Sequence, residues 1–110
     1  MLSDEVRFKL FRLLEANPCA SQRDLARELG ISLGKVNYCL QALIQMGLIK
    51  ATNFKNSKSK VAYMYLLTPR GIQEKAEVTA SFLQRKLREH DELKDEIEAV
   101  RKHAELQARR

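Results

Sequence analysis

Several structural classes are disfavoured by what the sequence lacks. No apolar run reaches the roughly 18 residues that a membrane-spanning helix requires, and no secretory segment is present. The sequence has only two cysteines, Cys19 and Cys39, without a CxxC pair or a nearby pair of histidines. These absences argue against a membrane partner, a disulfide framework and a zinc site. We expect a soluble cytoplasmic protein whose two thiols are buried and reduced.

The residue patterns of the common enzyme classes are also missing. His90 and His103 are the only histidines, and no nucleophile motif lies near either of them. The sequence contains no glycine-rich phosphate loop, no constellation of paired acids and no metal-ligand spacing. We therefore expect a protein without catalytic activity, cofactor or bound metal.

Acidic residues are missing from one long stretch, between Glu28 and Glu74. The chain has a net charge of +6, and this stretch carries six basic residues: Lys35, Lys50, Lys55, Lys58, Lys60 and Arg70. A solvated surface usually mixes both signs, so a stretch of one sign indicates a polyanionic partner. Nucleic acid is favoured over a membrane because no amphipathic basic helix with an exposed aromatic face accompanies the lysines.

Three short helices are expected in the first half of the chain. A serine that can cap a helix N-terminus precedes each of them: Ser3, Ser21 and Ser32. The second and third are each followed by a glycine, the residue that most often ends a helix: Gly30 and Gly47. The third helix has apolar residues at helical spacing: Val36, Leu40, Leu43 and Ile44.

A hairpin and a long helix are expected in the second half. Segments 48–54 and 61–67 are predicted to be strands of an antiparallel hairpin around the turn-rich KNSKSK. Pro69 then opens a helix, since a missing N–H has no cost in the first turn. No helix breaker follows Gly71, so this helix is expected to continue to the end of the chain.

A helix-turn-helix results where the second and third helices are joined by the short turn LGIS, and the basic hairpin after them makes the unit a winged helix. The segment SQRDLARELGISLGKVNYCLQALIQMGLIK, with the later LTPRG, resembles the MarR-type winged-helix regulators. It is most similar to the short members of this family that are associated with exopolysaccharide gene clusters. The resemblance covers residues 3–75.

The resemblance implies a mainly α-helical fold with a small β-hairpin. It implies a winged helix-turn-helix DNA-binding domain over residues 1–69 and a C-terminal dimerisation helix over residues 70–110. The implied function is regulation of transcription, with exopolysaccharide genes as targets. Larger MarR proteins have an additional N-terminal helix that joins the dimer interface and helps to form a ligand pocket. Because this chain begins at the first helix of the winged domain, we do not expect a small-molecule effector.

Gly34 stands in the first turn of the third helix, where glycine costs about 1 kcal/mol relative to alanine. In a helix-turn-helix the N-terminal residues of this helix enter the major groove, and a residue without a Cβ lets the backbone approach DNA. Free N–H groups and the positive dipole end of the helix also suit phosphate. Gly34 is therefore interpreted as a close-contact position with DNA. The alternative is an exposed glycine without a role.

The outward face of the third helix supplies the residues expected to read the DNA sequence. Lys35 suits guanine or phosphate, and Asn37 and Gln41 carry amides that can pair with adenine edges. Tyr38 offers a hydroxyl to phosphate and a ring to a thymine methyl group. These side chains face solvent because the apolar residues of the helix face the core. The alternative is a polar surface without a role.

Further DNA contacts are expected on both sides of this helix. Gln22 and Arg23 begin the second helix and are expected to hold the DNA backbone without reading sequence, and Ser32 is assigned to the same surface. Four residues at the hairpin tip are expected to contact phosphates or the minor groove, unless the tip is only a solvated loop: Lys55, Asn56, Lys58 and Lys60. Tyr63 and Tyr65 share one face of the second strand and are expected to be packing residues first, with contacts at the base of the hairpin as the alternative.

The last helix has an imperfect apolar seam with heptad spacing, which predicts a coiled-coil homodimer because an exposed single helix would leave the seam in water. Six residues are assigned to this interface: Leu83, Leu87, His90, Leu93, Ile97 and Val100. Glu89 and Glu96 fall at g positions, and Lys94 and Arg101 at e positions, which favours a parallel pair because acid then meets base. The two-fold symmetry of such a dimer would match a palindromic operator on double-stranded DNA.

A second function class stays open at this point. A winged helix can serve as a protein-interaction module, in which the C-terminal helix docks a partner and DNA is incidental. The acid-free stretch favours DNA, since a protein-docking hairpin does not need six basic residues without an acid. Retention on heparin with a steep salt dependence distinguishes the two.

Overall fold

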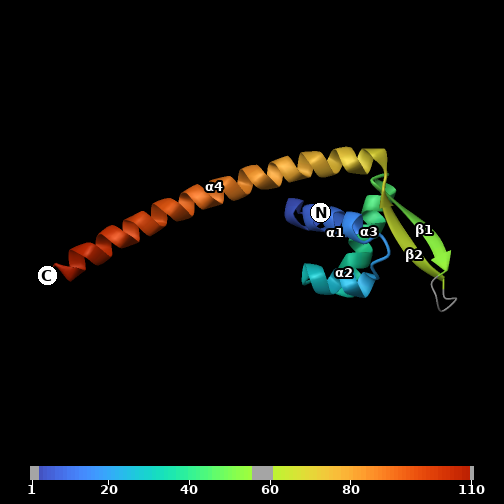
Figure 1. Ribbon diagram of the computed structural model, residues 1–110, viewed down its shortest axis with the longest axis horizontal. Coiled ribbons are helices and arrows are strands. Elements are labelled where there is room, and N and C mark those ends of the chain that lie inside the picture. The colour runs from blue at the N-terminus through green and yellow to red at the C-terminus, as the bar shows by residue number, and fades with distance from the viewer. Residues whose placement is uncertain (1–2, 56–60, 110) are drawn as a thin grey trace.

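A computed structural model describes residues 3–55 and 61–109 of the chain. Three helices and a two-stranded hairpin form a small domain, from which a fourth helix extends as a long rod (Figure 1). In chain order the elements are α1 (Asp4–Ala16), α2 (Gln22–Leu29), α3 (Leu33–Gln45), β1 (Ile49–Lys55), β2 (Val61–Leu67) and α4 (Pro69–Ala108). The mainly helical winged architecture predicted from the sequence is confirmed. Within the described ranges, no helix combines the length and apolar character needed to cross a bilayer.

Hydroxyl side chains cap the helices, as the sequence predicts. The hydroxyls of three residues accept a hydrogen bond from the backbone N–H three positions later: Ser3, Ser32 and Thr68. Ser21 and Asp24 form a capping box at α2, in which each side chain accepts a bond from the backbone N–H of the other. Gly30 ends α2 with a φ of 67°, a left-handed conformation that glycine adopts without strain. These local bonds satisfy groups that helix termini otherwise leave open.

The hydrophobic core lies where α1, α2, α3 and the base of the hairpin meet. The largest fully buried side chains come from the three helices: Leu10, Phe11, Leu14, Leu25, Val36, Cys39, Leu40 and Leu43. Leu48, Ile49 and Tyr65 add the contribution of the hairpin. On α1 and α3 the buried residues recur at helical spacing, so each helix turns one face inward. This burial fixes the rotation of α3 about its axis.

The hairpin is antiparallel, from Ile49 opposite Leu67 to Lys55 opposite Val61, within one residue of the predicted strands. The loop before α2 also bonds to it, because the backbone N–H of Tyr65 donates to the carbonyl of Pro18 at 3.0 Å. Tyr65 is buried, as expected. The expectation that Tyr63 also packs was wrong: it is 57% exposed because it lies two residues nearer the hairpin tip, beyond the helices.

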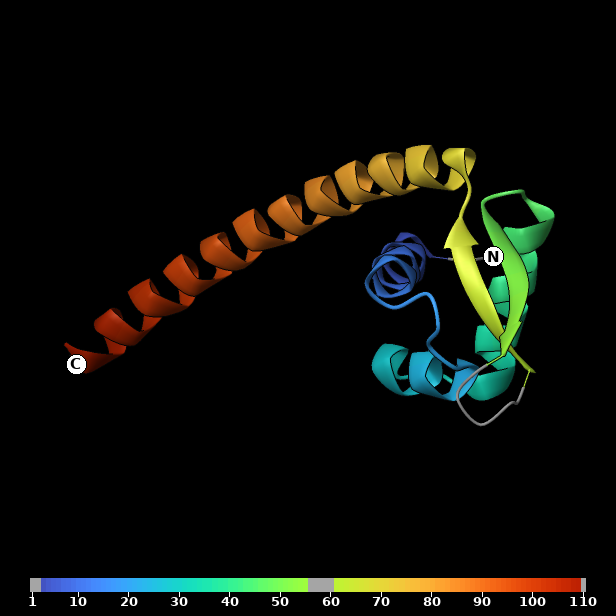
Figure 2. The same cartoon turned by 45° about the vertical axis from the view of Figure 1, so that its right-hand side comes forward.

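The first turns of α4 lie along α1 (Figure 2). Gly71 lets the start of α4 come close to the backbone just before β1, since a Cβ at this position would lie 1.9 Å from the carbonyl oxygen of Leu48. Further along, the ring of Phe82 stacks on Phe8 with 4.8 Å between the ring centroids. Two ion pairs also join the helices: Arg7–Glu74 and Glu15–Lys75. We call the described residues up to Phe82 the winged domain, because the start of α4 packs as part of it.

Beyond this contact α4 continues without interruption to Ala108, as the lack of a helix breaker predicts. Every side chain from Lys86 to Arg109 is exposed, and we call residues 86–109 the distal helix. Its extension gives the molecule a longest dimension of 73 Å (Figure 1). The distal helix therefore has no packing partner within its own described chain.

The two thiols lie in different environments. Cys39 is buried on the inner face of α3, and this burial raises the pKa of its thiol. Cys19 is exposed, so the expectation of two buried thiols was wrong for this residue. Its backbone N–H donates to Oδ1 of Asn17 in the turn after α1, and the neighbouring Ala20 enters the core instead.

Candidate nucleic-acid interface

One face of α3 is exposed, and the polar residues predicted to read DNA lie on it. Lys35, Asn37, Tyr38 and Gln41 are all exposed, and Tyr38 reaches 59%. The opposite face carries the buried residues of this helix: Val36, Cys39, Leu40 and Leu43. The position of these side chains agrees with the sequence analysis, whereas their contact with DNA stays a prediction.

Gly34 opens the same surface at the start of α3. A Cβ built on Gly34 would have no atom within 4 Å, so the packing of the chain itself does not require glycine there. The exposed Ser32 caps the helix through the N–H of Lys35, and the remaining first-turn amides are groups that suit an anion. A close contact with DNA and an accidental glycine both stay compatible with this geometry.

The first residues of α2 lie beside this face of α3. Nε2 of Gln22 donates to Oδ1 of Asn37 at 3.4 Å and to the hydroxyl of Tyr65 at 3.2 Å. Gln22 is therefore half-buried and bonded to both neighbouring elements, whereas Arg23 is exposed. Sequence reasoning assigned Gln22 to the DNA backbone and missed these bonds. They join residues 15 and 43 positions apart, so no local pattern signals them.

The electrostatic character of this surface follows from the acid-free stretch, which includes all of α3, β1 and β2. The nearby acid Asp24 on α2 is held by the helix cap. Hydrogen bonds from the hydroxyl and backbone N–H of Ser21, together with the charge of Arg27, lower the pKa of Asp24. Its negative charge is thus paired locally, and α3 and the hairpin present only basic and neutral groups.

The acid-free surface continues from α3 onto the hairpin, which lies beside α3 (Figure 1). Lys55 is the last residue of β1. Asn56, Lys58 and Lys60 lie outside the residues that the structure describes, so their assignment to DNA contact stays a prediction.

Two further polar residues lie in the hairpin between its tip and Tyr65. Asn53 and Tyr63 face each other in the strand register, and both are exposed. The ring of Tyr63 lies 6.3 Å from that of Tyr65, the residue that bonds to Gln22. Sequence reasoning did not select either residue. The alternation of β2 assigns Tyr63 to the face of Tyr65, but only the folded position of α2 shows which of the two is covered.

This geometry agrees with what is known of related proteins. A family model described as winged helix-turn-helix DNA-binding matches residues 3–50. The solved structure of Lactococcus lactis ZitR, a zinc-responsive MarR family member, aligns with a TM-score of 0.61 at 25% identity. That alignment covers 87% of this chain and 63% of the ZitR chain. The chain therefore has a winged helix-turn-helix unit that is similar to that of a MarR family member.

Two other solved structures are also similar to this chain. The transcriptional repressor CouR, bound to a 23-mer DNA duplex, aligns with a TM-score of 0.55 at 29% identity, over 66% of this chain and 50% of CouR. The adhesin competence repressor AdcR of Streptococcus pyogenes aligns with a TM-score of 0.60 at 23% identity, over 94% of this chain and 78% of AdcR. The chain thus spans less than two thirds of ZitR and of CouR. No curated protein sequence matches it significantly.

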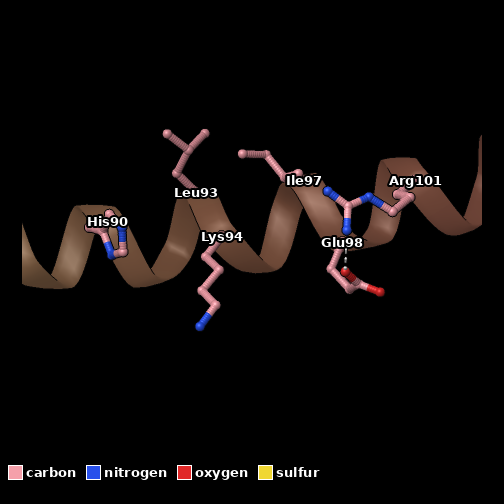
Figure 3. Close-up of a pocket in the computed structure, with 6 residues that line it drawn as sticks. All are labelled: His90, Leu93, Lys94, Ile97, Glu98 and Arg101. Atoms are coloured by element: carbon pink, nitrogen blue, oxygen red, sulfur yellow. Dashed lines mark ion pairs between the residues drawn. The ribbon is translucent and has the colours of Figure 1, made fainter.

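The predicted dimerisation residues lie along α4, beyond or at the edge of its contact with α1. All six are exposed: Leu83, Leu87, His90, Leu93, Ile97 and Val100. Figure 3 shows Leu93 and Ile97 projecting from one side of the helix and Lys94 from the other. Glu98 and Arg101 form an ion pair at 3.6 Å beside them. In the part of the chain that the structure describes, no group of His, Cys, Asp or Glu residues is arranged to hold a metal.

Proposed function

We propose that this protein is a sequence-specific, double-stranded DNA-binding regulator of transcription. The observation that supports this proposal is the continuity of one surface: the exposed polar face of α3 adjoins a hairpin, and neither carries an acidic residue. In helix-turn-helix proteins the second helix of the motif, here α3, lies in the major groove. CouR, a relative with the same fold, was solved on a DNA duplex.

The residues of this surface have separate roles in the proposal. Lys35, Asn37, Tyr38 and Gln41 contact base edges and adjacent phosphates, and Gly34 lets the helix backbone come close. The remaining residues hold the DNA backbone or the minor groove without reading sequence: Arg23, Ser32, Lys55, Asn56, Lys58 and Lys60. Gln22 adjoins them, and its side-chain NH2 group is bonded within the protein.

We further propose that the protein is a homodimer through α4. Five apolar side chains of the predicted seam are between 49% and 68% exposed: Leu83, Leu87, Leu93, Ile97 and Val100. Helices of this kind are stabilised mostly by packing of an apolar face, and a second copy of the chain offers the same seam. The heptad positions a and d carry most of these residues, with His90 as a polar residue in the middle.

Charges beside the seam support a parallel arrangement. Glu89 and Glu96 occupy g positions, and Lys94 and Arg101 occupy e positions, so each glutamate in a parallel pair meets a basic residue five positions on in the partner. An antiparallel pair would set glutamate against glutamate. Each exposed pair contributes only about 0.2–1 kcal/mol, so these charges select an orientation more than they hold the dimer.

A two-fold dimer fits a palindromic operator, in which each half-site receives one α3 helix. Genomic DNA as the partner implies a cytoplasmic location. The sequence resemblance makes exopolysaccharide genes the first targets to examine, and genome-wide binding footprints of the full chain would name them. No small-molecule effector is part of the proposal.

The proposal is tested by selection from a random duplex library with the full chain at two salt concentrations. We expect enrichment of a palindrome and a binding constant that falls steeply with salt. A variant with Lys35, Asn37 and Gln41 all replaced by alanine is the matched control, and it should keep the salt dependence while losing the enrichment. A full chain that enriches no sequence and elutes from heparin at low salt contradicts the proposal. That result favours a protein-interaction module whose α4 docks another partner.

A further inference from the structure

Gln22 connects three parts of the proposed DNA surface through one amide group. Its Nε2 carries two hydrogens, and it has two acceptors: Oδ1 of Asn37 on α3 at 3.4 Å and the hydroxyl oxygen of Tyr65 on β2 at 3.2 Å. Gln22 is the first residue of α2, so the start of that helix is joined to both neighbours.

Tyr65 makes this arrangement rigid. Its side chain is only 5% exposed, and its backbone N–H is bonded to the carbonyl of Pro18 at 3.0 Å. The hydroxyl is therefore a fixed point at the edge of the core. Because Nε2 of Gln22 bonds to it, the Gln22 amide is oriented before any DNA arrives.

The bond to Gln22 determines which end of the Asn37 amide is presented outward. An asparagine amide has an acceptor oxygen on one side and an NH2 donor on the other. With Oδ1 engaged by Gln22, the NH2 group of the exposed Asn37 is the end left for a ligand. Oδ1 keeps a second lone pair, so a bidentate contact with adenine would require Oδ1 to accept from Gln22 and from the adenine N6 amino group together.

We propose that Gln22 is a positioning residue that holds Asn37 as a hydrogen-bond donor and thereby sets the base preference at one position of each half-site. This inference rests on the proposed DNA-binding function. Asn37 then selects a base that presents acceptors in the major groove, such as the O6 and N7 of guanine or the O4 of thymine. It discriminates against cytosine, whose N4 amino group would meet the Asn37 NH2 group.

The variant Gln22→Glu tests this inference because it reverses the amide. A carboxylate only accepts hydrogen bonds, so the hydroxyl of Tyr65 and the NH2 of Asn37 both donate to it. Oδ1 of Asn37 then faces outward as an acceptor. In a selection on random duplexes, one position of the half-site should change from a base with acceptors to cytosine, which presents only an amino group in the major groove. We expect the preference at that position to shift by about tenfold, with the other positions unchanged.

The added negative charge of Gln22→Glu is controlled by Arg23→Gln. Each substitution lowers the charge of the same helix start by one, so both should weaken binding to all duplexes. Only Gln22→Glu should change the selected base. Gln22→Leu removes the donor without offering an acceptor, and it should broaden the preference at the same position without reversing it.

A measurement without DNA follows the same hydrogen bond. In NMR spectra of the full chain, the side-chain NH2 protons of Asn37 should move downfield in Gln22→Glu, since they then donate to a carboxylate, and stay in place in Arg23→Gln. If Gln22→Glu and Gln22→Leu both select the wild-type base at every position, the inference is wrong while the proposed function stands. An unmoved Asn37 resonance in a folded Gln22→Glu protein also overturns it. A wild-type chain that selects no motif overturns the proposed function, and this inference with it.

Discussion

Each helix of the winged domain buries apolar side chains against the others, whereas the distal helix, residues 86–109, leaves every side chain in water. The charges differ as well. From α3 through β2 the winged domain has no acidic residue, while the distal helix alternates acids and bases and forms pairs along its own length, such as Lys86–Glu89. One region is stabilised by its own core and presents charge of one sign. The other has no packing partner within its own described chain and carries charges of both signs.

The strongest test of this contrast removes one leucine side chain from each region. Leu40 is fully buried, so Leu40→Ala should lower the free energy of unfolding by about 2–5 kcal/mol. Leu93 is 54% exposed within its own chain, so Leu93→Ala should leave the core intact and weaken only the dimer. Thermal melting at two protein concentrations separates the effects, because only loss of the dimer depends on concentration. If Leu93→Ala lowers the melting temperature equally at both protein concentrations, the contrast is contradicted.

Removal of residues 84–110 should leave a folded monomer, because Phe82 and the core stay in place. Such a monomer engages one half-site at a time, and its affinity for a palindrome should fall by about 100-fold. Sedimentation of both chains gives the oligomeric state, and a titration with the selected palindrome gives the affinity. A truncated chain that still sediments as a dimer would show that the interface lies in the winged domain.

The packing of the start of α4 against the hairpin is tested with a pair of glycine variants. Gly71→Ala forces a Cβ onto the carbonyl of Leu48, which should lower the free energy of unfolding by about 1–3 kcal/mol. Gly34→Ala meets open space in a helix, so it should raise the same quantity by up to about 1 kcal/mol. Urea unfolding of both variants is the measurement. A neutral Gly71→Ala would mean that the start of α4 is not held against the hairpin.

Alanine variants of three lysines should change DNA binding differently, according to the region in which each lysine lies. Lys35→Ala, on α3, should cost about 1 kcal/mol or more on the operator and little on random duplex. Lys58→Ala, at the hairpin tip, should weaken both alike and lower the salt slope by about 1. Lys102→Ala, in the distal helix, should change neither. Titrations at several salt concentrations decide this, and a lower slope from Lys102→Ala would extend the DNA surface to the distal helix.

The smallest expected effect is on thermal stability at low pH. Hydrogen bonds from Ser21 hold the pKa of Asp24 below its ordinary value of 3.8. The ionised cap therefore adds stability above that value, and this part is lost as the pH falls through the lower folded pKa. Asp24→Asn should reduce the loss of melting temperature between neutral pH and pH 3, whereas Asp95→Asn in the distal helix, the control, should not. If the melting temperatures of Asp24→Asn and of the parent chain fall equally between neutral pH and pH 3, the Asp24 cap does not contribute to the acid sensitivity.

Features that depend on neighbouring residues were predictable from the sequence, and features that join distant residues were not. The caps at Ser3, Ser21 and Ser32 bond to residues three positions on, so the residue types alone indicate them. The exposed face of α3 follows in the same way from the spacing of its apolar residues. The approach of Gly71 to Leu48 has no such local signal, since it depends on how α4 meets the hairpin.

The candidate site shows the same division. Sequence reasoning found the polar residues of α3 and expected Asn37 to offer both ends of its amide to a base. It could not foresee that Gln22 occupies one of those ends, because the fold alone brings the start of α2 against α3 and β2. Cys19 shows that residue type alone does not determine burial. A thiol is most often buried, but a turn bonded to Asn17 directs this one outward.

The 40 residues of α4 extend about 60 Å, and the helix is attached to the winged domain only near its first end. About 26 residues of α4, or roughly 40 Å, lie beyond the contact at Phe82, so a rotation of the helix by about 5° at Phe82 would move its far end by roughly 3 Å. In the proposed dimer the two distal helices are joined along their length. Each winged domain is therefore held at a fixed angle to the coiled coil. The distance between the two α3 helices then depends on how residues 71–82 of α4 pack against the rest of the winged domain.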